Sequence, residues 1–223
     1  MDGLGHHTLD QLSCSSRKTK PGEPTGVSRR CGTHEPPMRS PMRHWLLTWT
    51  TYGTWLPGDD RGSITAIRVN TTGERVHYNL PGTPCVGELS ELRDAARDLM
   101  KGPPIFLVLE QAKVLLTQFH ETANYRSWSL DSVAIMANHI HIVVTVDGDP
   151  EPAMLLRDFK SYGSRSLTRR GAKPINGTWW TTGGSKRKLP DENARRAANE
   201  YVKNQARSLI IWTADENPGE PTV

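Results

Sequence analysis

Runs of aromatic and β-branched residues mark the chain segments that predict strands. HWLLTWTT, residues 44–51, is dense in such side chains and predicts a first strand. The stretch SWSLDSVAIMANHIHIVVTV predicts two more strands, over residues 127–136 and 139–146. A tight turn at Ala137 and Asn138 joins them, so we expect an antiparallel hairpin.

Apolar residues at a helical spacing predict four helices, over residues 89–99, 105–123, 152–170 and 191–209. A proline opens the third helix and a glycine follows it, which suits the first helical position and the C-terminal stop. Residues 62–87 show no such period and are interpreted as irregular. The resulting order is β, α, α, β, β, α, α. It predicts an α+β fold with helices packed on a mainly antiparallel sheet.

The two ends of the chain differ from its middle in composition. Only 35% of the 223 residues are hydrophobic, and these gather in the middle. Residues 1–41 are rich in Gly, Pro, Ser, Thr and Arg without periodicity, which predicts a disordered tail. Residues 213–223 are interpreted as a second tail. One domain is therefore expected over residues 42–212, a usual size for a single core.

The cysteines and the hydropathy indicate the expected compartment. Cys14, Cys31 and Cys85 are odd in number and far apart, which argues against a disulfide framework and favours a reducing environment. No apolar run approaches the ~20 residues that cross a bilayer, and no signal peptide opens the chain. We expect a soluble, cytoplasmic protein without a membrane partner. Cys31 and His34 have a zinc-like spacing, but no second pair accompanies them.

Positive charge is concentrated in the last third of the chain. The net charge is +4, yet residues 154–207 hold 13 Lys and Arg against 4 Asp and Glu, a local net of +9. Such segregation indicates a polyanionic partner that contacts one half of the domain. A solvated basic face explains the same count, and this alternative stays open.

Two histidines in the second strand of the hairpin are candidates for chemistry. Side chains alternate between the faces of a strand, so His139 and His141 point to one side, while Ile140, Ile142 and Val144 point to the other. At ~3.3 Å of rise per residue the two imidazoles lie about 6.6 Å apart along the strand, close enough to share one metal ion. A half-exposed strand with two histidines is the alternative.

The last predicted helix carries a candidate nucleophile and a candidate ligand. Its residues at a 3.6-residue period form one stripe, expected to pack on the sheet: Ala194, Ala197, Ala198, Tyr201, Gln205 and Leu209. Tyr201 and Gln205 are four residues apart and so lie on one helix face. A buried amide needs a polar partner, which a metal site supplies. Ordinary packing, with Gln205 at the edge of the stripe, explains the pattern too.

Seven further side chains suit contact with a nucleic acid strand, through charge, hydroxyl groups or aromatic faces: Arg157, Lys160, Ser164, Trp179, Trp180, Arg187 and Lys188. The first three share one side of the 152–170 helix. A solvated helix face and core tryptophans are the competing interpretations.

The order of these motifs resembles a known family. NHIHIVV, FKSYGSRSL, WWTTGGS and YVKNQ follow one another within residues 44–210. This set is similar to the single-tyrosine HUH transposases of small bacterial insertion sequences and to the repeat-associated tyrosine transposases. The resemblance implies a ferredoxin-like HUH nuclease architecture in which His139, His141 and Gln205 bind Mg²⁺ or Mn²⁺. It implies that Tyr201 cleaves and rejoins single-stranded or hairpin DNA through a 5′-phosphotyrosine during transposition, in sites that two subunits can share.

Other interpretations remain beside this resemblance. Histidine-triad hydrolases would require a third histidine where Val143 stands, and two-histidine phosphoesterases would require a second H-x-T or H-x-S motif. A catalytically decayed or non-catalytic single-strand binder would have the same charge pattern but form no covalent adduct. Tyr162, on the basic 152–170 helix, is the rival nucleophile, although it more naturally continues the packing stripe of Leu155 and Phe159.

Overall fold

The computed structural model describes residues 41–59, 65–68, 75–78, 89–171 and 173–216. The predicted tail over residues 1–41, apart from its last residue, lies outside these ranges, as do the three cysteines, His34 and the end of the tail over residues 213–223. Within the described residues, no helix is both long and apolar enough to cross a membrane.

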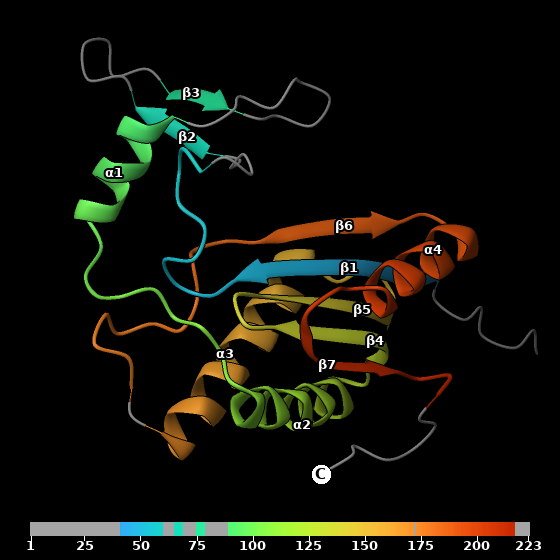
Figure 1. Cartoon of the computed structure of the whole chain (residues 1–223). Helices are drawn as coiled ribbons and strands as arrows, with labels where there is room; N and C mark the ends of the chain where they lie inside the picture. Colours follow the sequence, from blue (N-terminus) through green and yellow to red (C-terminus); the bar gives the residue numbers. More distant parts are fainter. Residues whose placement is uncertain (1–40, 60–64, 69–74, 79–88, 172, 217–223) are drawn as a thin grey trace, which may run out of the picture. The chain divides into compact units, whose positions relative to one another are not determined.

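Five antiparallel strands form the sheet at the centre of the fold (Figure 1). They stand in the order β6, β1, β5, β4, β7, with the bounds Ser185–Leu189, Met42–Thr50, His139–Asp147, Ser129–Met136 and Ser208–Thr213. β5 therefore lies in the middle, hydrogen-bonded to β1 on one side and to β4 on the other. Its run of apolar and β-branched residues suits a strand that is covered on both faces.

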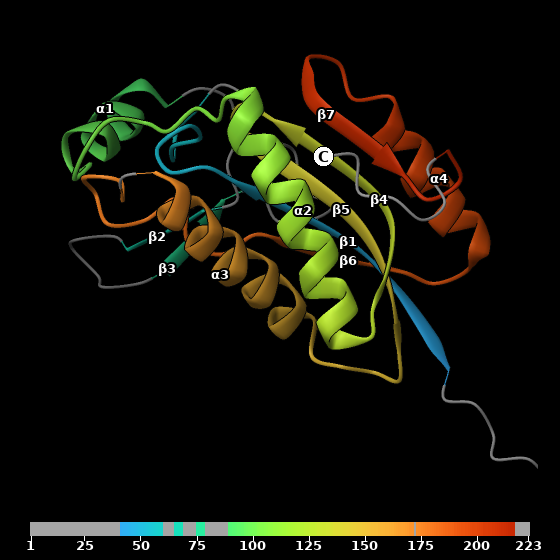
Figure 2. The ribbon, with the colours of Figure 1, turned by 90° about the horizontal axis from the view of Figure 1, so that it is seen from below.

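Two helices cover one face of the sheet, as Figure 2 shows. These are α2, Leu109–Arg126, and α3, Pro152–Arg170, which bury Phe119, Leu155 and Phe159 against the sheet. Ile140, Ile142 and Val144 of β5 enter the same cluster, which confirms the predicted inner face of this strand. The order β1, α2, β4, β5, α3, β6 with helices on one face is the ferredoxin-like arrangement.

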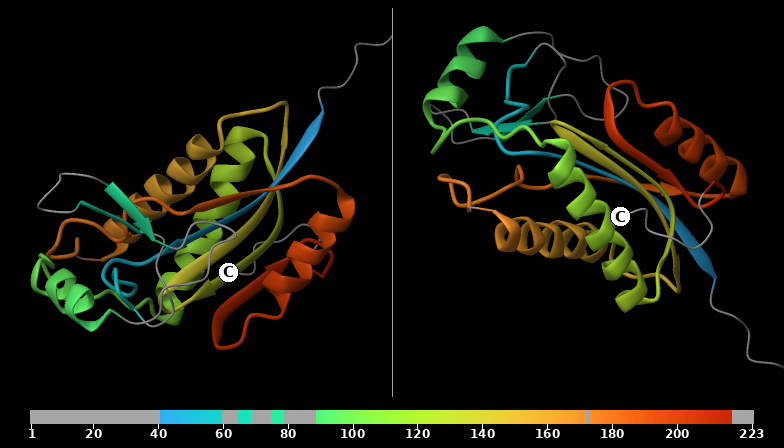
Figure 3. Two further views of the ribbon diagram at one scale, coloured as in Figure 1. Left: turned by 90° about the horizontal axis from the view of Figure 1, so that it is seen from above. Right: turned by 60° about the horizontal axis from the view of Figure 1, so that its bottom comes forward.

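A third helix covers the opposite face (Figure 3). This helix, α4, spans Glu192–Lys203, and Asp191 caps it by accepting a hydrogen bond from the backbone N–H of Ala194. Ala198 and Val202 are its buried residues, and they join Val143 of β5 in a smaller second cluster. The two histidines of β5 face this side of the sheet.

The predicted α+β class is confirmed, and β5 and α3 begin where predicted, but four segments differ from the sequence prediction. The helix expected over residues 105–123 is α2, which begins only at Leu109 and ends at Arg126. The helix expected over residues 191–209 ends at Lys203, and β7 follows it. Residues 185–189, interpreted as a basic connection, form edge strand β6. Residues 62–87, interpreted as irregular, contain the two-stranded pair β2, Thr65–Arg68, and β3, Arg75–Tyr78. A short helix, α1, Ser90–Asp98, agrees with the helix predicted over residues 89–99.

Gly163 permits the close packing of α3 on α2. A Cβ atom built at this position would lie 3.0 Å from Cδ2 of Leu115 and 3.4 Å from Cε1 of Phe119. Glycine costs up to ~1 kcal/mol relative to alanine in an ordinary helix interior. Here the missing side chain is what allows the two helices to approach.

We expect Gly163→Val to lower the free energy of unfolding by about 1–3 kcal/mol, because the two methyl groups overpack the α2–α3 contact. Arg165→Val, two residues along the same helix at an exposed position, serves as the control for β-branching. Urea unfolding followed by circular dichroism measures both. Equal stability of the two variants would contradict the packing role of Gly163.

Candidate active site

His139 and His141 stand side by side on the face of β5 that α4 covers. Their ring centroids are 5.0 Å apart, with the rings nearly perpendicular. The alternation of a strand places them there, since Ile140 between them is fully buried on the other side. The predicted pairing of the two imidazoles on one face is confirmed by this geometry.

Each histidine has a hydrogen-bond partner at Nδ1. Nδ1 of His141 lies 2.7 Å from Oγ1 of Thr48, which is its direct neighbour on β1. Nδ1 of His139 lies 2.7 Å from Oδ1 of Asn138 in the β4–β5 turn. In the tautomers that donate Nδ1–H to these oxygens, both Nε2 atoms carry lone pairs. Partners of this kind orient histidine ligands in metal sites.

Burial keeps His141 neutral at physiological pH. The side chain is only 4% exposed, and burial, followed by the charge of His139, lowers the pKa of His141 to about 4. A metal must compete with protons for an imidazole nitrogen, and here that competition is weak above this pKa. His141 therefore stays unprotonated, which is the state in which an imidazole can bind a metal ion.

Tyr201 reaches the histidine pair from the side of α4. Its hydroxyl lies 3.4 Å from Nε2 of His141, and the two ring centroids are 5.2 Å apart. The predicted place of Tyr201 on the packing face of the helix is wrong, because the side chain is 49% exposed and Val202 is the buried neighbour. The tyrosine instead lies at the edge of the helix contact, with one side on His141 and the other open to solvent.

Gln205 lies outside α4 and does not share its helical face. The helix ends two residues earlier, and Nε2 of Gln205 donates to the backbone oxygen of Tyr201 at 3.0 Å. The prediction of a tyrosine and an amide on one helix is therefore wrong. The side chain of Gln205 still contacts the backbone of Tyr201, and its role as third ligand remains a prediction.

Polar contacts hold α4 on the sheet, since only two of its side chains are buried. Arg195 forms an ion pair of 3.1 Å with Asp131 of β4, whose carboxylate is 8% exposed. The other oxygen of this carboxylate accepts from Oγ1 of Thr145 at 2.7 Å. One turn along the helix, Oδ1 of Asn199 accepts from the hydroxyl of Ser132 at 2.7 Å. These contacts determine where the helix, and with it Tyr201, lies.

The residues present fit a divalent cation held by two imidazoles. Their Nδ1 atoms are occupied by oriented partners, and their rings are adjacent on one face. Over the ranges that the structure describes, no cluster of three or more His, Cys, Asp and Glu side chains could hold a metal. Any further protein ligand at this site must come from another residue type, such as the amide of Gln205.

The residues predicted to contact nucleic acid fall on different parts of the fold. Arg157, Lys160 and Ser164 lie on α3, on the sheet face opposite the histidines, where they line one groove. Arg187 and Lys188 are exposed on edge strand β6.

Trp179 and Trp180 correspond to the alternative interpretation, that of core tryptophans. They are 7% and 5% exposed, and their indole N–H groups donate to Oγ1 of Thr168 and to the backbone oxygen of Lys160. Both rings belong to the core, although Trp180 also lines the groove beside α3, so the expected stacking on bases stays a prediction.

Tyr162, the rival nucleophile, lies on α3 and hence in the other helical layer. Its ring contacts Tyr125 of α2, at a centroid distance of 6.4 Å, and the guanidinium of Arg165 lies 4.8 Å from its centroid. The sheet separates it from the histidine pair. The geometry favours Tyr201.

Four residues that position the site are not among the residues predicted from the sequence. Thr48 and Asn138 orient the histidines, and Asp131 and Arg195 orient the helix. The signal for Asn138 was present, since it immediately precedes the H-x-H motif in a turn. Thr48 acts across the β1–β5 pair, so only the register of the sheet reveals its partner, whereas Asp131 pairs with Arg195 of α4, and only the packing of that helix reveals this contact.

Residues 106–205 match the family model described as "Transposase IS200 like". The matched segment begins before α2 and ends at Gln205, so it contains both histidines and Tyr201. No curated protein sequence matches the chain.

Two solved structures are similar at low sequence identity. One is described as a REP-associated tyrosine transposase bound to a REP hairpin, with 10% identity and a TM-score of 0.39 over 73% of this chain. The chain covers 66% of that protein, slightly less than two thirds of its length. The other is a putative transposase from Deinococcus radiodurans R1, with 12% identity, a TM-score of 0.38 and coverage of 77% of this chain and 96% of that chain.

We expect Asp131→Asn to lower the free energy of unfolding by about 1–3 kcal/mol, because it removes the charge that pairs with Arg195 across the α4–sheet contact. Glu192→Gln is the matched control, since Glu192 pairs with the same arginine but is exposed. That variant should show no measurable change. Thermal or urea unfolding distinguishes the two. A loss of equal size in both would contradict a specific role for the buried carboxylate.

Proposed function

Residues 106–205 belong to the IS200-like transposase family, and from that premise we propose that this chain cleaves and rejoins single-stranded DNA, with Tyr201 as the nucleophile. The family match confirms the resemblance that the ordered motifs indicate. One observation carries the proposal for the chemistry: the hydroxyl of Tyr201 lies 3.4 Å from Nε2 of His141, on the face that also holds His139. A nucleophile and a pair of candidate metal ligands are thus next to each other.

The proposed reaction exchanges one phosphate ester for another. The oxygen of Tyr201 attacks the phosphorus of a DNA phosphodiester, a bond forms between them, and the bond to the 3′ oxygen breaks. The phenol proton passes to solvent, to which the half-exposed side chain is open, and the 3′ oxygen leaves as a hydroxyl after taking a proton from solvent. A 3′-hydroxyl attacks the 5′-phosphotyrosine in the reverse step, which rejoins a strand and frees Tyr201.

His139 and His141 would hold Mg²⁺ or Mn²⁺, with Gln205 as the candidate third ligand. A bound divalent cation supplies Lewis-acid polarisation of the scissile phosphate. Thr48 and Asn138 keep the two rings in place through their contacts with Nδ1, so the ligand nitrogens need little rearrangement. The low pKa of His141 keeps its imidazole unprotonated over the physiological range.

The arrangement supports a site completed within one chain. α4 packs on the sheet of its own chain through Asp131 and Arg195, and it brings Tyr201 to His141 of the same chain. Sites shared between two subunits, which the resemblance allows, would require α4 to leave these contacts.

We expect His139→Ala and His141→Ala each to abolish formation of a covalent protein–DNA adduct while single-strand binding stays within a few fold, because binding depends mostly on the basic residues. EDTA should act like either substitution, with activity restored by Mn²⁺. A labelled hairpin with single-stranded flanks, run on a denaturing gel, measures the adduct, and filter binding measures affinity. His120→Ala, which removes an imidazole from α2 in the other layer, is the control. Full adduct formation by a protein that carries both His139→Ala and His141→Ala would refute the metal site.

Mixing two inactive variants tests whether one chain completes the site. We expect a mixture of His141→Ala and Tyr201→Phe proteins to form no adduct, because each chain retains only half of its own site. The readout is the same denaturing gel over a series of protein concentrations, because dimer formation depends on the concentration of the protein. Adduct formation by the mixture would show that two subunits exchange their helices.

A further inference from the structure

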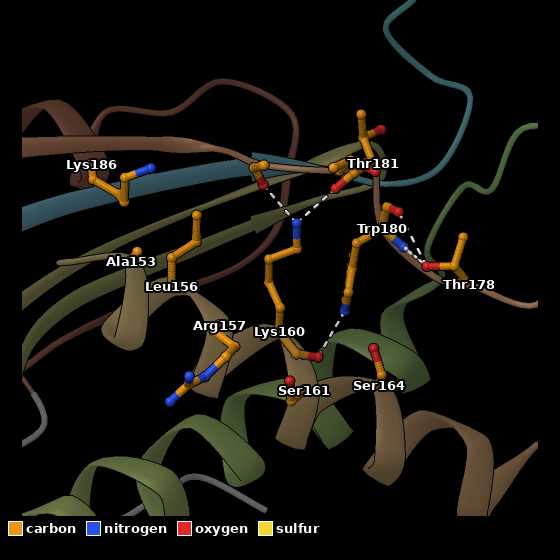
Figure 4. Close-up of a pocket in the computed structure, with 12 residues that line it drawn as sticks. Ala153, Leu156, Arg157, Lys160, Ser161, Ser164, Thr178, Trp180, Thr181 and Lys186 are labelled. Atoms are coloured by element: carbon orange, nitrogen blue, oxygen red, sulfur yellow. Dashed lines mark hydrogen bonds between the residues drawn. The ribbon is translucent and has the colours of Figure 1, made fainter. Parts of the chain in front are cut away.

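A groove of about 450 Å³ lies between α3 and the segment 178–186, on the sheet face opposite the histidine pair (Figure 4). One wall is the helix, with Arg157, Lys160 and Ser164, and the other is the turn that leads into β6. The volume is in the range of pockets that accept a nucleotide-sized group. The metal site proposed above takes no residue from this groove.

The groove carries a surplus of positive charge. Arg157, Lys160 and Lys186 line it, and none of the described lining residues is an Asp or a Glu. Asp158 balances part of the charge from outside, because its carboxylate lies 3.3 Å from Nε of Arg157. Burial, followed by repulsion from Lys186, lowers the pKa of Lys160 to about 8. Two lysines that repel each other in a half-buried groove favour an anion between them.

Lys160 is held in a fixed position in the groove. Its ammonium donates to the backbone oxygens of Thr181 and Gly183, both at 2.6 Å, as the dashed lines in Figure 4 show. An ammonium group has three N–H donors, so one remains for an incoming oxygen. The hydroxyls of Ser161 and Ser164, one and four residues further along α3, line the same space. These groups are the donors that a phosphate group requires.

The turn that holds Lys160 also touches the strand beside the histidines. The backbone N–H of Thr181 donates to the oxygen of Thr50, which pairs with His139 across β1 and β5. A Cβ at Gly184 would lie 2.8 Å from the oxygen of Thr48, so only glycine permits this close approach. The groove and the histidine pair thus lie on opposite faces of the sheet, and β1 contacts the elements that form both.

Cations lie on both faces of the neighbouring edge strand. Lys186 pairs with Leu47, which belongs to the core beneath α2 and α3, and so it lies on the groove side. Arg187 pairs with Leu46, which belongs to the cluster beneath α4, and so it lies on the histidine side. A nucleic acid backbone that passes around the outer edge of β6 would meet a positive charge before and after the crossing.

We propose that this groove binds a backbone phosphate of the same single DNA strand whose scissile phosphate lies at the histidine pair, with the strand passing around the edge of β6. This inference rests on the proposed function, which places the scissile phosphate at the histidine pair. A polymer rather than a free anion is favoured because the positive charges continue from the groove to Arg187 on the histidine side of β6. The groove is thus a second anchor that determines which part of a bound strand reaches Tyr201.

The test compares two lysines of one strand. Lys186 and Lys188 lie on the same face of β6, but only Lys186 lines the groove, whereas Lys188 lies over the ring of Trp45. We expect Lys186→Gln to weaken binding of a single-stranded oligonucleotide about fivefold and to reduce the slope of log K against log salt by ~0.7, the value for one lost phosphate contact. The proposed path gives Lys188 no phosphate contact, against the expectation from the sequence, because its ammonium lies over the ring of Trp45 and outside the groove, so Lys188→Gln should change affinity less than twofold. Fluorescence anisotropy in EDTA measures both without cleavage.

The length of the oligonucleotide distinguishes DNA that spans the groove and the histidine pair from DNA that contacts only one of them. Oligonucleotides lengthened stepwise on either side of the cleavage position should gain affinity for the unsubstituted protein at the length that spans both sites, and Lys186→Gln should remove that gain. Equal losses in the two lysine variants would show a diffuse basic face and overturn the proposal. Displacement of the oligonucleotide by inorganic phosphate or a nucleoside monophosphate, beyond the effect of matched chloride, would show a small-anion site and also overturn it.

The two proposals fail in different ways. If the unsubstituted protein forms a covalent adduct but Lys186→Gln and Lys188→Gln bind alike, the second anchor is wrong and the catalytic proposal stands. If Lys186→Gln alone loses affinity but no adduct forms under any condition, the anchor stands and the catalytic proposal is wrong.

Discussion

The burial of β5 on both of its faces is the constraint on which the rest of the molecule depends. One face supplies fully buried Ile140, Ile142 and Val144 to the core beneath α2 and α3. A one-residue slip of this strand would exchange the two faces and place imidazoles in that core. The apolar face therefore fixes the register, and the register places His139 and His141 on the side of α4. The same large core that stabilises the fold thus positions the polar pair.

The helix that carries Tyr201 is attached much more weakly than the helices of the other layer. Only Ala198 and Val202 are buried from it, whereas α2 and α3 bury long rows of apolar and aromatic side chains. Its position therefore depends on the ion pair between Arg195 and Asp131 and on the contact of Asn199 with Ser132. The carboxylate of Asp131 is buried, so the loss of its partner is costly. In the proposed function this helix carries the nucleophile, so these few contacts determine where Tyr201 meets the strand.

The sequence predicts the parts of the fold in which the periodicity agrees with burial. The alternation in β5 and the apolar stripe of α3 both correspond to observed buried faces. β6 was missed because four of its five residues are exposed and polar, as suits a sheet edge, so it has no apolar pattern. The helical stripe through Tyr201 was extended too far, because Leu209 matched its period while belonging to β7.

The residues of the candidate site likewise divide into those that a local sequence pattern predicts and those that it does not. The two histidines are two residues apart on one strand, so alternation alone places them on the same face. Thr48 and Asp131 act on partners in other elements, and no local pattern identifies them. Trp179 and Trp180 were ambiguous, since aromatic residues in a Gly- and Thr-rich segment suit either a core or a stacking surface. The structure buries both.

Mapping the residue that becomes linked to DNA is the most direct test of the central claim. The adduct formed with a hairpin substrate and Mn²⁺ would be digested with protease and nuclease, and the modified peptide sequenced by tandem mass spectrometry. We expect a 5′-phosphonucleotide on the tyrosine of the peptide that contains Glu200, Tyr201 and Val202, and its loss in Tyr201→Phe. DNA attached to Tyr162, or an undiminished adduct in Tyr201→Phe, would contradict the account.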